Sequence, residues 1–362
     1  MSTLATLATP AVLVDRARLA ANIRGMQALC DQHGVELRPH IKTHKMVAVA
    51  RQQLTAGARG LTCAKLGEAE AMLPSGVRSI FVAHSLVDPN QAARIAALAD
   101  QLDDFRVAVT SEAHAEALIR LATAVGRQLG VMMAVDSGLG REGVRAAASA
   151  NRIAVRLARC AQVELRGFYT HEGHFYGLPR EQVPARAAEL IEQMSALRDA
   201  IDSDLAIWPG CSVSARLIAQ SGSGRVQAVR PGAYVFGDLF LTKTTGVMAV
   251  DAVALHVLAT VVDKPEAGLA LIDAGSKTFS SDKTPEGISA LAADGRDLAV
   301  VRVNEEHGYV RGTAVDALQL GDRIIFTPAH VCTTVNLTDT VVVTEAGRPV
   351  ETWRVEARGR TQ

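Results

Sequence analysis

The sequence predicts an α/β protein in which a (β/α)8 TIM-type barrel is followed by an antiparallel β-domain. Between residue 35 and about residue 236, eight short apolar runs alternate with helical patterns. Eight strands separated by helices over roughly 200 residues are what a (β/α)8 barrel requires. A doubly wound sheet is the alternative, because the order of strands in a sheet cannot be read from sequence. The eight runs are 35–42, 60–65, 79–85, 105–111, 130–138, 165–173, 205–212 and 228–236.

Helical patterns lie between these runs, and one more helix precedes them. The preceding helix, at about 16–33, follows an opening strand at 11–14. The other helices are expected at about 46–57, 67–74, 89–101, 113–127, 143–161, 179–202 and 213–221.

The character of the chain changes after about residue 240. Gly, Pro and Asp turns separate β-like runs, and no long amphipathic helix interrupts them, which indicates a separate antiparallel β-domain. The loop Ser280–Arg296 is rich in Gly, Ser, Asp and Pro, so we expect it to be exposed and mobile. The expected domains are 12–238 and 239–362, with residues 1–11 as an optional addition to the second. The β-like runs are 247–264, 269–272, 298–303, 323–326, 340–344 and 351–355.

Composition excludes several classes of partner. The formal net charge is zero, which gives no electrostatic reason to expect nucleic acid or an anionic membrane as partner. No stretch approaches the roughly 20 apolar residues that a membrane span needs, and Pro10 precedes any long apolar run, so no signal peptide is expected. The five cysteines are scattered and lack a Cys-x-x-Cys pair, which indicates a reducing compartment. We therefore expect a cytoplasmic protein.

The stretch Leu37–Lys45 contains the main candidate for a reactive group, Lys42. This lysine falls at the C-terminal end of a predicted strand, the edge that carries the chemistry in α/β barrels. Partial burial and the like charge of Lys45, among His40 and His44, would disfavour the ammonium form of Lys42. Its pKa would then be lowered, and the neutral amine would be available for a Schiff base. Without further context, a basic surface turn explains the same residues.

Other polar residues fall at or just beyond the predicted C-terminal strand ends. A Gly/Ser turn at 209–214, followed by a short helix, could present backbone N–H groups and hydroxyls to a phosphate, although an ordinary turn is the alternative. Arg230–Tyr234 offers a second such turn with a phenol attached. Arg141 lies on a glycine-rich loop and could pair with a phenolate or phosphate oxygen, or be a surface arginine. The residues at strand ends are Lys42, Asp136, Arg141, His171, His174, Cys211, Ser212, Ser214 and Tyr234.

The β-domain contains a His-x-Cys pair, His330 and Cys332. If this stretch is extended, the two side chains point the same way, because strand side chains alternate. An imidazole and a thiolate so placed can hold one borderline-soft divalent ion. The alternative is a buried cysteine beside a histidine whose hydrogen bonds are satisfied. His307 is a further polar candidate, facing the same site or lying on a turn.

Seven motifs in chain order resemble the D-threonine aldolase / D-serine dehydratase family of pyridoxal-phosphate enzymes, which share the alanine-racemase-like barrel. The resemblance spans nearly the whole chain, and its most specific block is His-x-Lys-Thr-His-Lys. The motifs are Thr9–Ala11, Arg38–Lys45, Val135–Arg141, Thr170–His174, Arg230–Tyr234, Glu306–Gly308 and His330–Cys332.

The resemblance implies a barrel that carries pyridoxal 5'-phosphate, a β-domain that closes over it, and a homodimer that shares its active sites. It also implies that Lys42 forms the Schiff base, with His40 at the cofactor and Arg141 near the cofactor's 3-oxygen. Tyr169 and His171 are both candidates to contact the pyridine nitrogen. The residues implied around the phosphate are Gly210, Cys211, Ser212, Ser214, Gly232 and Tyr234.

The resemblance further implies that His330 and Cys332 bind one divalent metal (Zn, Mn, Mg or Co) beside the substrate's hydroxyl. Characterised aldolases tend to carry aspartate where Cys332 stands, whereas the dehydratases carry cysteine. The histidine proposed as base in some aldolases lies where this chain has Gly177. The nearest imidazoles are His171 and His174, and His307 is a further catalytic candidate.

The expected activity is cleavage of a β-hydroxy-D-amino acid to glycine and an aldehyde. The alternative is dehydration of D-serine or D-3-hydroxyaspartate to a 2-oxo acid and ammonia. A racemase would need a second base, commonly a tyrosine of the β-domain, and Tyr309 is the only tyrosine after Tyr234. A non-catalytic cofactor carrier would lack the β-domain.

Overall fold

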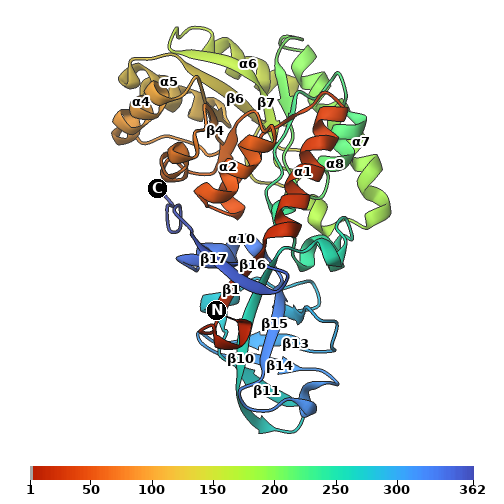
Figure 1. Cartoon of the computed structure of the whole chain (residues 1–362). Helices are drawn as coiled ribbons and strands as arrows, with labels where there is room; N and C mark the ends of the chain where they lie inside the picture. Colours follow the sequence, from red (N-terminus) through yellow and green to blue (C-terminus); the bar gives the residue numbers. More distant parts are fainter. Residues whose placement is uncertain (1–2) are drawn as a thin grey trace. The chain divides into compact units, whose positions relative to one another are not determined.

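The structure, a computed structural model, describes residues 3–362 and divides into two compact units (Figure 1). The barrel unit contains residues 24–42, 47–232 and 360–362, and the β-unit contains residues up to 23, 43–46 and 233–359. The structure thus places the main boundary at 232–233. It also assigns the opening strand β1 (Ala11–Asp15) to the β-unit, because β1 pairs with β10 and β16. Sequence carries no signal for such pairing partners.

The barrel unit contains eight parallel strands. Six of them form one parallel sheet in chain order, and β2 pairs in parallel with β9. A bridge between His40 and Thr62 joins β2 to β3. The Gln227 N–H donates to the Ile207 carbonyl at 3.2 Å and joins β9 to β8. These contacts complete the predicted eight-strand barrel and exclude the doubly wound sheet. The strands are β2 (Glu36–Leu37), β3 (Leu61–Cys63), β4 (Ser79–Val82), β5 (Asp104–Val109), β6 (Leu129–Val135), β7 (Val163–Thr170), β8 (Ala206–Trp208) and β9 (Ala228–Val229).

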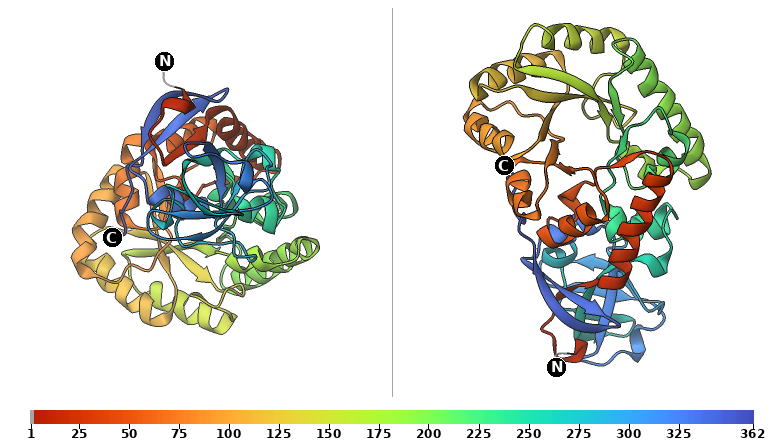
Figure 2. Two further views of the ribbon diagram at one scale, coloured as in Figure 1. Left: turned by 90° about the horizontal axis from the view of Figure 1, so that it is seen from below. Right: turned by 45° about the horizontal axis from the view of Figure 1, so that its top comes forward.

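Helices cover the outer side of the barrel strands, as both views of Figure 2 show. The helix α5 illustrates why these segments are helical: Ser111 caps its N-terminus by accepting from the His114 N–H, and Gly126 ends it at φ 73°. The helices are α1 (Arg16–Gln32), α2 (Val47–Ala56), α3 (Leu66–Met72), α4 (Ala92–Gln101), α5 (Glu112–Val125), α6 (Ala147–Leu157), α7 (Val183–Asp199) and α8 (Ala215–Ser221).

An aromatic cluster fills the inside of the barrel. Phe81 meets Tyr169 and Trp208 edge-on, with ring centroids 4.9 and 5.9 Å apart. The guanidinium groups of Arg38 and Arg106 lie over the Trp208 ring. These side chains make the barrel interior a packed core. An active site is therefore expected at the ends of the strands rather than inside the barrel.

The β-unit is an antiparallel barrel extended by further strands, which confirms the predicted β-domain. Six strands follow the order β11–β14–β13–β12–β15–β10, and pairing of β10 with β11 closes the ring. Beyond β10, the sheet continues through β1, β16 and β17. The strands are β10 (Leu255–Glu266), β11 (Leu269–Ile272), β12 (Ala290–Ala292), β13 (Ala299–Val303), β14 (Gly308–Arg311), β15 (Arg323–Pro328), β16 (Thr340–Glu345) and β17 (Arg348–Arg354).

The structure corrects the sequence-based assignment in three places of the β-unit. The segment 280–296, expected as a loop, contains β12, which pairs with β13 and β15. The strand β14 was not predicted, because it is short and begins at a glycine. The stretch around His330, expected to be extended, leaves β15 at Pro328 and enters the helix α10 (Val331–Asn336).

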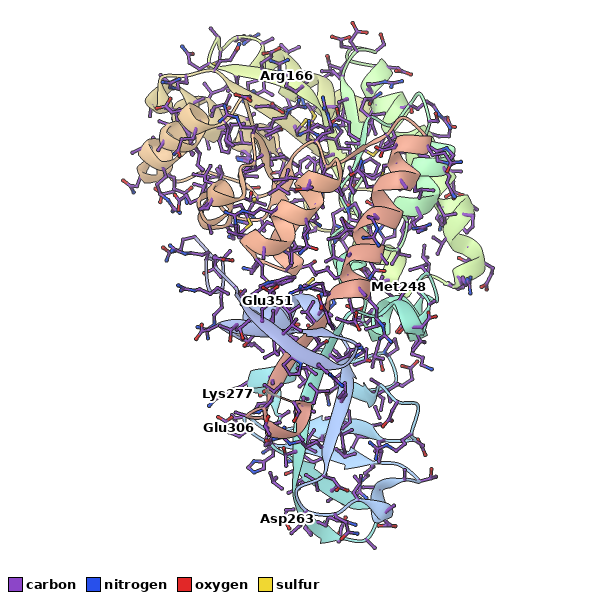
Figure 3. The ribbon with its side chains drawn as sticks, viewed as in Figure 1. Arg166, Met248, Asp263, Lys277, Glu306 and Glu351 are labelled. Carbon is purple, nitrogen blue, oxygen red and sulfur yellow. The ribbon has the colours of Figure 1, made fainter. Side chains whose placement is uncertain are left out.

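A surface ion pair joins the helix α9 (Ser276–Phe279) to the turn between β13 and β14. Lys277, in this short helix, places its Nζ 2.5 Å from Oε1 of Glu306, and Figure 3 labels both residues. About two thirds of each side chain is exposed, so the pair contributes little to stability.

None of the helices within residues 3–362 has the length and apolar character of a membrane span.

Candidate active site

A cavity of about 250 Å³ opens at the C-terminal ends of the barrel strands. It brings together five of the residues expected around a cofactor: His40, Lys42, Arg141, Tyr169 and His171. It also contains five lining residues that sequence reasoning did not select as site residues, namely Ala64, Ala83, His84, Glu142 and Arg230.

Lys42 reaches this cavity from a single 3-10 turn, Ile41–Thr43, that follows β2. Its side chain is half-buried, and its backbone N–H donates weakly to Nδ1 of His40 at 3.4 Å. The His40 N–H donates to the Pro231 carbonyl, which ties the turn to the end of β9. Lys45 belongs to the β-unit, where its ammonium donates to the Ala357 carbonyl at 3.4 Å.

His171 contributes a neutral imidazole to the cavity. Burial lowers its pKa to about 3, and the charges of Lys42 and Arg141 act in the same direction, against the hydrogen bond to Gly210. Its Nδ1 lies 2.7 Å from the Gly210 carbonyl, and a carbonyl only accepts, so Nδ1 carries the proton. Nε2 is therefore the acceptor of this ring at neutral pH.

Arg230 and Tyr169 form the buried floor of the cavity. The Arg230 guanidinium donates to the Trp208 and Thr170 carbonyls, and burial lowers its pKa to about 10 although Tyr169 and Glu172 oppose the shift. Burial also raises the pKa of the Tyr169 phenol. Among residues 3–362, its hydroxyl has no hydrogen-bond partner. A buried hydroxyl without a partner is costly, which indicates that a polar ligand belongs beside it.

The two turns expected to hold a phosphate are bonded to each other, since Gly232 N–H donates to Ser212 Oγ at 3.2 Å. Ser214 Oγ donates its proton to the buried Glu172 carboxylate at 2.6 Å, so it has none left for a phosphate. Burial and the Glu172 charge raise the pKa of the Cys211 thiol to about 12. Tyr234 is buried in the β-unit, in the 3-10 turn Ala233–Val235.

Glu172 should make stability depend on pH. Burial raises its pKa above the ordinary 4.5, despite hydrogen bonds from Ser214 and Gly210. The folded protein therefore binds this proton more tightly than the unfolded chain. The associated stability is fully present below pH 4.5 and is lost as the pH rises through the raised pKa. The glutamine in Glu172→Gln cannot titrate. As the pH rises above 4.5 and through the raised pKa, the melting temperature of wild type should therefore fall relative to that of Glu172→Gln. A difference between the two melting temperatures that does not change with pH would contradict this.

His174 lies in a different cavity, of about 370 Å³, with Gly138, Phe175 and Arg186. Burial lowers its pKa, opposed by Asp136. Its ring meets Phe175 edge-on at 4.8 Å. The structure therefore separates two histidines that are near neighbours in sequence, and only His171 shares the cavity with Lys42. His307 is exposed, in the turn between β13 and β14.

In the β-unit, His330 and Cys332 are neighbours even though the stretch is not extended. His330 is the N-cap of α10 and Cys332 lies in its first turn. Nδ1 of His330 is 3.1 Å from Oδ2 of the buried Asp238, and Thr43 Oγ1 is 3.1 Å from Cys332 Sγ. Burial lowers the pKa of His330, but the Cys332 thiolate and Asp238 outweigh it, and the pKa is raised well above its usual value.

This donor set fits a divalent ion in its chemistry. An imidazole and a thiolate are ligands that zinc and its neighbours prefer. A carboxylate that accepts from the other ring nitrogen is the usual support of a metal-bound histidine, and Asp238 is so placed. Among residues 3–362, no group of three or more His, Cys, Asp or Glu side chains is arranged for a metal. An ion held by His330 and Cys332 would keep positions for substrate and water.

Comparison with known proteins now decides the family. Residues 14–239 match the family model for the N-terminal domain of alanine racemase, and residues 254–344 match a serine dehydratase domain model. The chain is 32% identical to a D-threonine aldolase from Arthrobacter sp, over 98% of this chain and 94% of the relative. It is also 32% identical to the D-threo-3-hydroxyaspartate dehydratase of Delftia sp. (strain HT23), over 97% and 98%. The chain belongs to the D-threonine aldolase / D-serine dehydratase family.

Solved structures agree with this membership. The D-threonine aldolase from Filomicrobium marinum superposes with a TM-score of 0.88 at 27% identity, over 99% of this chain and 98% of the other. The Delftia dehydratase superposes with a TM-score of 0.87 at 31% identity, over 98% and 99%. The protein is an enzyme of the lyase type, and its alanine racemase-like fold implies pyridoxal phosphate as cofactor.

The lyase contains functional candidates that sequence reasoning missed. Arg230 precedes a Pro-Gly turn at a strand end, a signal that was available. Glu172 stands within the Thr170–His174 motif, but its contact with Ser214 is visible only in the fold. Nothing in the sequence marks His84 or Asp238, because each depends on contacts with residues far away in the chain. Thr43 stands within the lysine block, but its contact with Cys332 is visible only in the fold.

Proposed function

We propose that this lyase uses pyridoxal phosphate on Lys42 and a divalent metal on His330 and Cys332 to cleave β-hydroxy-D-amino acids to glycine and an aldehyde. The observation that carries the proposal is the half-buried Lys42 in a cavity also lined by a buried arginine and by a tyrosine hydroxyl that has no partner within residues 3–362. The 32% identity with the Arthrobacter aldolase over 98% of this chain supports a lyase that acts on such substrates.

The lining of the cavity fits the cofactor in its chemistry. Lys42 supplies the amine that joins the cofactor aldehyde. Tyr169, His171 and Arg230 line the cavity and would contact the ring, and Ser212 with the Gly232 turn would meet the phosphate. His40 packs beside the lysine turn, and Arg141 offers a cation to the cofactor's 3-oxygen. When bound, pyridoxal phosphate supplies an electron sink for the electron pair that remains when a bond to Cα breaks.

The metal proposal rests on the imidazole–thiolate pair and on a relative. A D-threo-3-hydroxyaspartate dehydratase, 31% identical to this chain, was solved as a cysteine-to-alanine variant in a metal-free form. In the present lyase, Asp238 holds Nδ1 of His330, which leaves Nε2 for the ion, and Cys332 adds a thiolate. A divalent ion held there would supply a Lewis acid that lowers the pKa of a substrate hydroxyl.

The remaining steps belong to side chains of the chain itself. In aldol cleavage, a base removes the proton of the β-hydroxyl before the Cα–Cβ bond breaks. His171 offers a neutral Nε2 within the Lys42 cavity, whereas His174 faces another cavity and His307 lies in the exposed turn. We therefore assign the proton-accepting role to His171. The family resemblance also supports a homodimer.

Dehydration is the second candidate, and Cys332 favours it. The dehydratases are the branch that the resemblance associates with cysteine at this position. In that reaction, the Lys42 amine would remove the Cα proton and the β-hydroxyl would leave. No further base would be needed. This suits the cavity, because the lowered pKa of His171 makes its imidazole a weak base.

Incubation of the purified holoenzyme with D-threonine separates the two candidates. The proposal predicts acetaldehyde and glycine in equal amounts, because cleavage of Cα–Cβ yields both. Dehydration would yield 2-oxobutanoate and ammonia. Coupled assays for acetaldehyde and for the 2-oxo acid, run with and without a chelator, measure both outcomes. Production of 2-oxobutanoate alone would overturn the aldolase assignment and leave the family assignment intact.

A further inference from the structure

A lysine–histidine pair beside the Lys42 cavity has no role in the reaction described above. His84 follows β4 and lines the cavity. Its Nε2 lies 2.9 Å from Nζ of Lys65, which follows β3. Both residues belong to the barrel unit and lie at the edge that carries the chemistry.

The contact with Lys65 determines which nitrogen of His84 carries a proton. A lysine ammonium has only donors, so Nε2 must accept and Nδ1 must be protonated. Burial lowers the pKa of His84, and the charge of Lys65 adds to this, with Glu142 opposing and Arg141 reinforcing it. The side chain is therefore a neutral imidazole with one donor, Nδ1–H.

The loop that carries His84 is fixed in place. The next residues are held by His114, whose Nε2 donates to the Leu86 carbonyl at 3.1 Å. Nδ1 of His114 accepts from the Thr110 N–H at 3.2 Å, so this ring connects β5 to the loop after β4. The Ala83 N–H donates to the Cys63 carbonyl at 2.8 Å. Such support is what keeps a ligand-contacting group in one position.

The order of strands around the barrel indicates what His84 faces. In the ring β8–β9–β2–β3–β4–β5–β6–β7, the end of β4 lies opposite the end of β8. The turns proposed for the phosphate follow β8 and β9. The 3-oxygen is on the half of the pyridine ring remote from the phosphate arm. It would therefore lie toward β4 and toward Arg141, which follows β6.

We propose that His84, held by Lys65 in its Nδ1–H form, is a cofactor-contacting residue that donates a hydrogen bond to the 3-oxygen of pyridoxal phosphate. This inference rests on the proposed attachment of the cofactor to Lys42. It adds a second donor beside Arg141 and gives the Lys65–His84 pair a function in setting the electronic state of the bound cofactor.

The contact has a measurable consequence. The negative 3-oxygen also accepts from the protonated nitrogen that joins Lys42 to the cofactor. A donor from the protein competes for that oxygen, so the nitrogen holds its proton less tightly. Loss of the His84 donor should therefore raise the pH midpoint at which the yellow form of the bound cofactor loses that proton.

The experiment is a pH titration of the absorption spectrum of purified holoenzyme at matched cofactor loading. We expect His84→Leu to raise the midpoint by about one pH unit, the size of one hydrogen bond to a charged acceptor. Lys65→Met removes the ammonium that selects the tautomer without touching the cavity lining, and should shift the midpoint in the same direction by less. His33→Leu, which removes a histidine from the C-terminal end of α1, should leave the midpoint unchanged.

Four outcomes are distinguishable. Shifts in both His84→Leu and Lys65→Met support the proposal. An unchanged midpoint in His84→Leu, with the cofactor still bound, overturns it. So does an unchanged midpoint together with a raised KM, which would mean that His84 faces the substrate. A wild-type protein without any yellow cofactor band would instead refute the attachment to Lys42 and the proposed function with it.

Discussion

Replacement of Lys42 by alanine is expected to remove both the yellow absorption of the purified protein and its turnover. The amine of Lys42 is the only lysine amine in the lining of the barrel-end cavity, within residues 3–362. Without it the cofactor has no covalent attachment, and in the dehydration alternative the base for the Cα proton is lost as well. We expect turnover to fall on the order of 10³-fold, within the range for loss of a general acid–base group. Visible spectroscopy and an assay of product formation measure the two effects.

Lys277→Ala is the matched control for this experiment. It removes the same kind of side chain from an exposed ion pair with Glu306, where little stability or function is at stake. Its spectrum and turnover should equal those of wild type. An unchanged absorption band in Lys42→Ala would remove the central assignment, provided that both variants melt at the wild-type temperature.

His330→Ala is expected to keep the yellow colour and to lose turnover. The substitution removes one of the two proposed metal ligands in the β-unit and leaves the barrel-end cavity intact. Lewis-acid stabilisation is worth several kcal/mol, so a fall in turnover of about 10²-fold or more is expected. Bound metal per protein, measured by elemental analysis after dialysis, should fall in parallel.

The fold should tolerate this change, because Asp238 keeps two other donors. Its carboxylate accepts from the Leu241 N–H at 3.0 Å and from the Val331 N–H at 3.2 Å. His33→Ala, far from this pair in sequence and outside the β-unit, serves as control. Turnover of His330→Ala near the wild-type rate would show that the metal role is wrong.

Most of the fold could be predicted because its signals are local. Each barrel strand is an apolar run between helical patterns, and the caps of α5 (Ser111 and Gly126) can be read directly from the sequence. The pairing of β1 could not be predicted, because its partners β10 and β16 lie more than 200 residues away in the chain, a relation that local patterns do not encode. The same limit explains β12, whose three residues form a strand only through their neighbours.

The candidate site was predictable where a motif carries it. The lysine block placed Lys42 at the strand end, and the structure puts it in the expected cavity with His171 and Arg141. Sequence could not decide whether His171 and His174 face the same cavity, because residues close together on one loop can point to different cavities. His330 and Cys332 were expected to lie together because side chains alternate along a strand, and this reason is wrong. A helix start brings the two side chains together instead.

The central claim is that the amine of Lys42 is covalently joined to the cofactor, and the direct test is to find which lysine bears it. Borohydride reduction fixes the cofactor to its amine, and mass spectrometry of the digested protein then locates the modified residue. We expect the pyridoxyl phosphate group on the peptide that contains Lys42. A modified Lys65, or no modified lysine in protein that retains activity, would contradict the account.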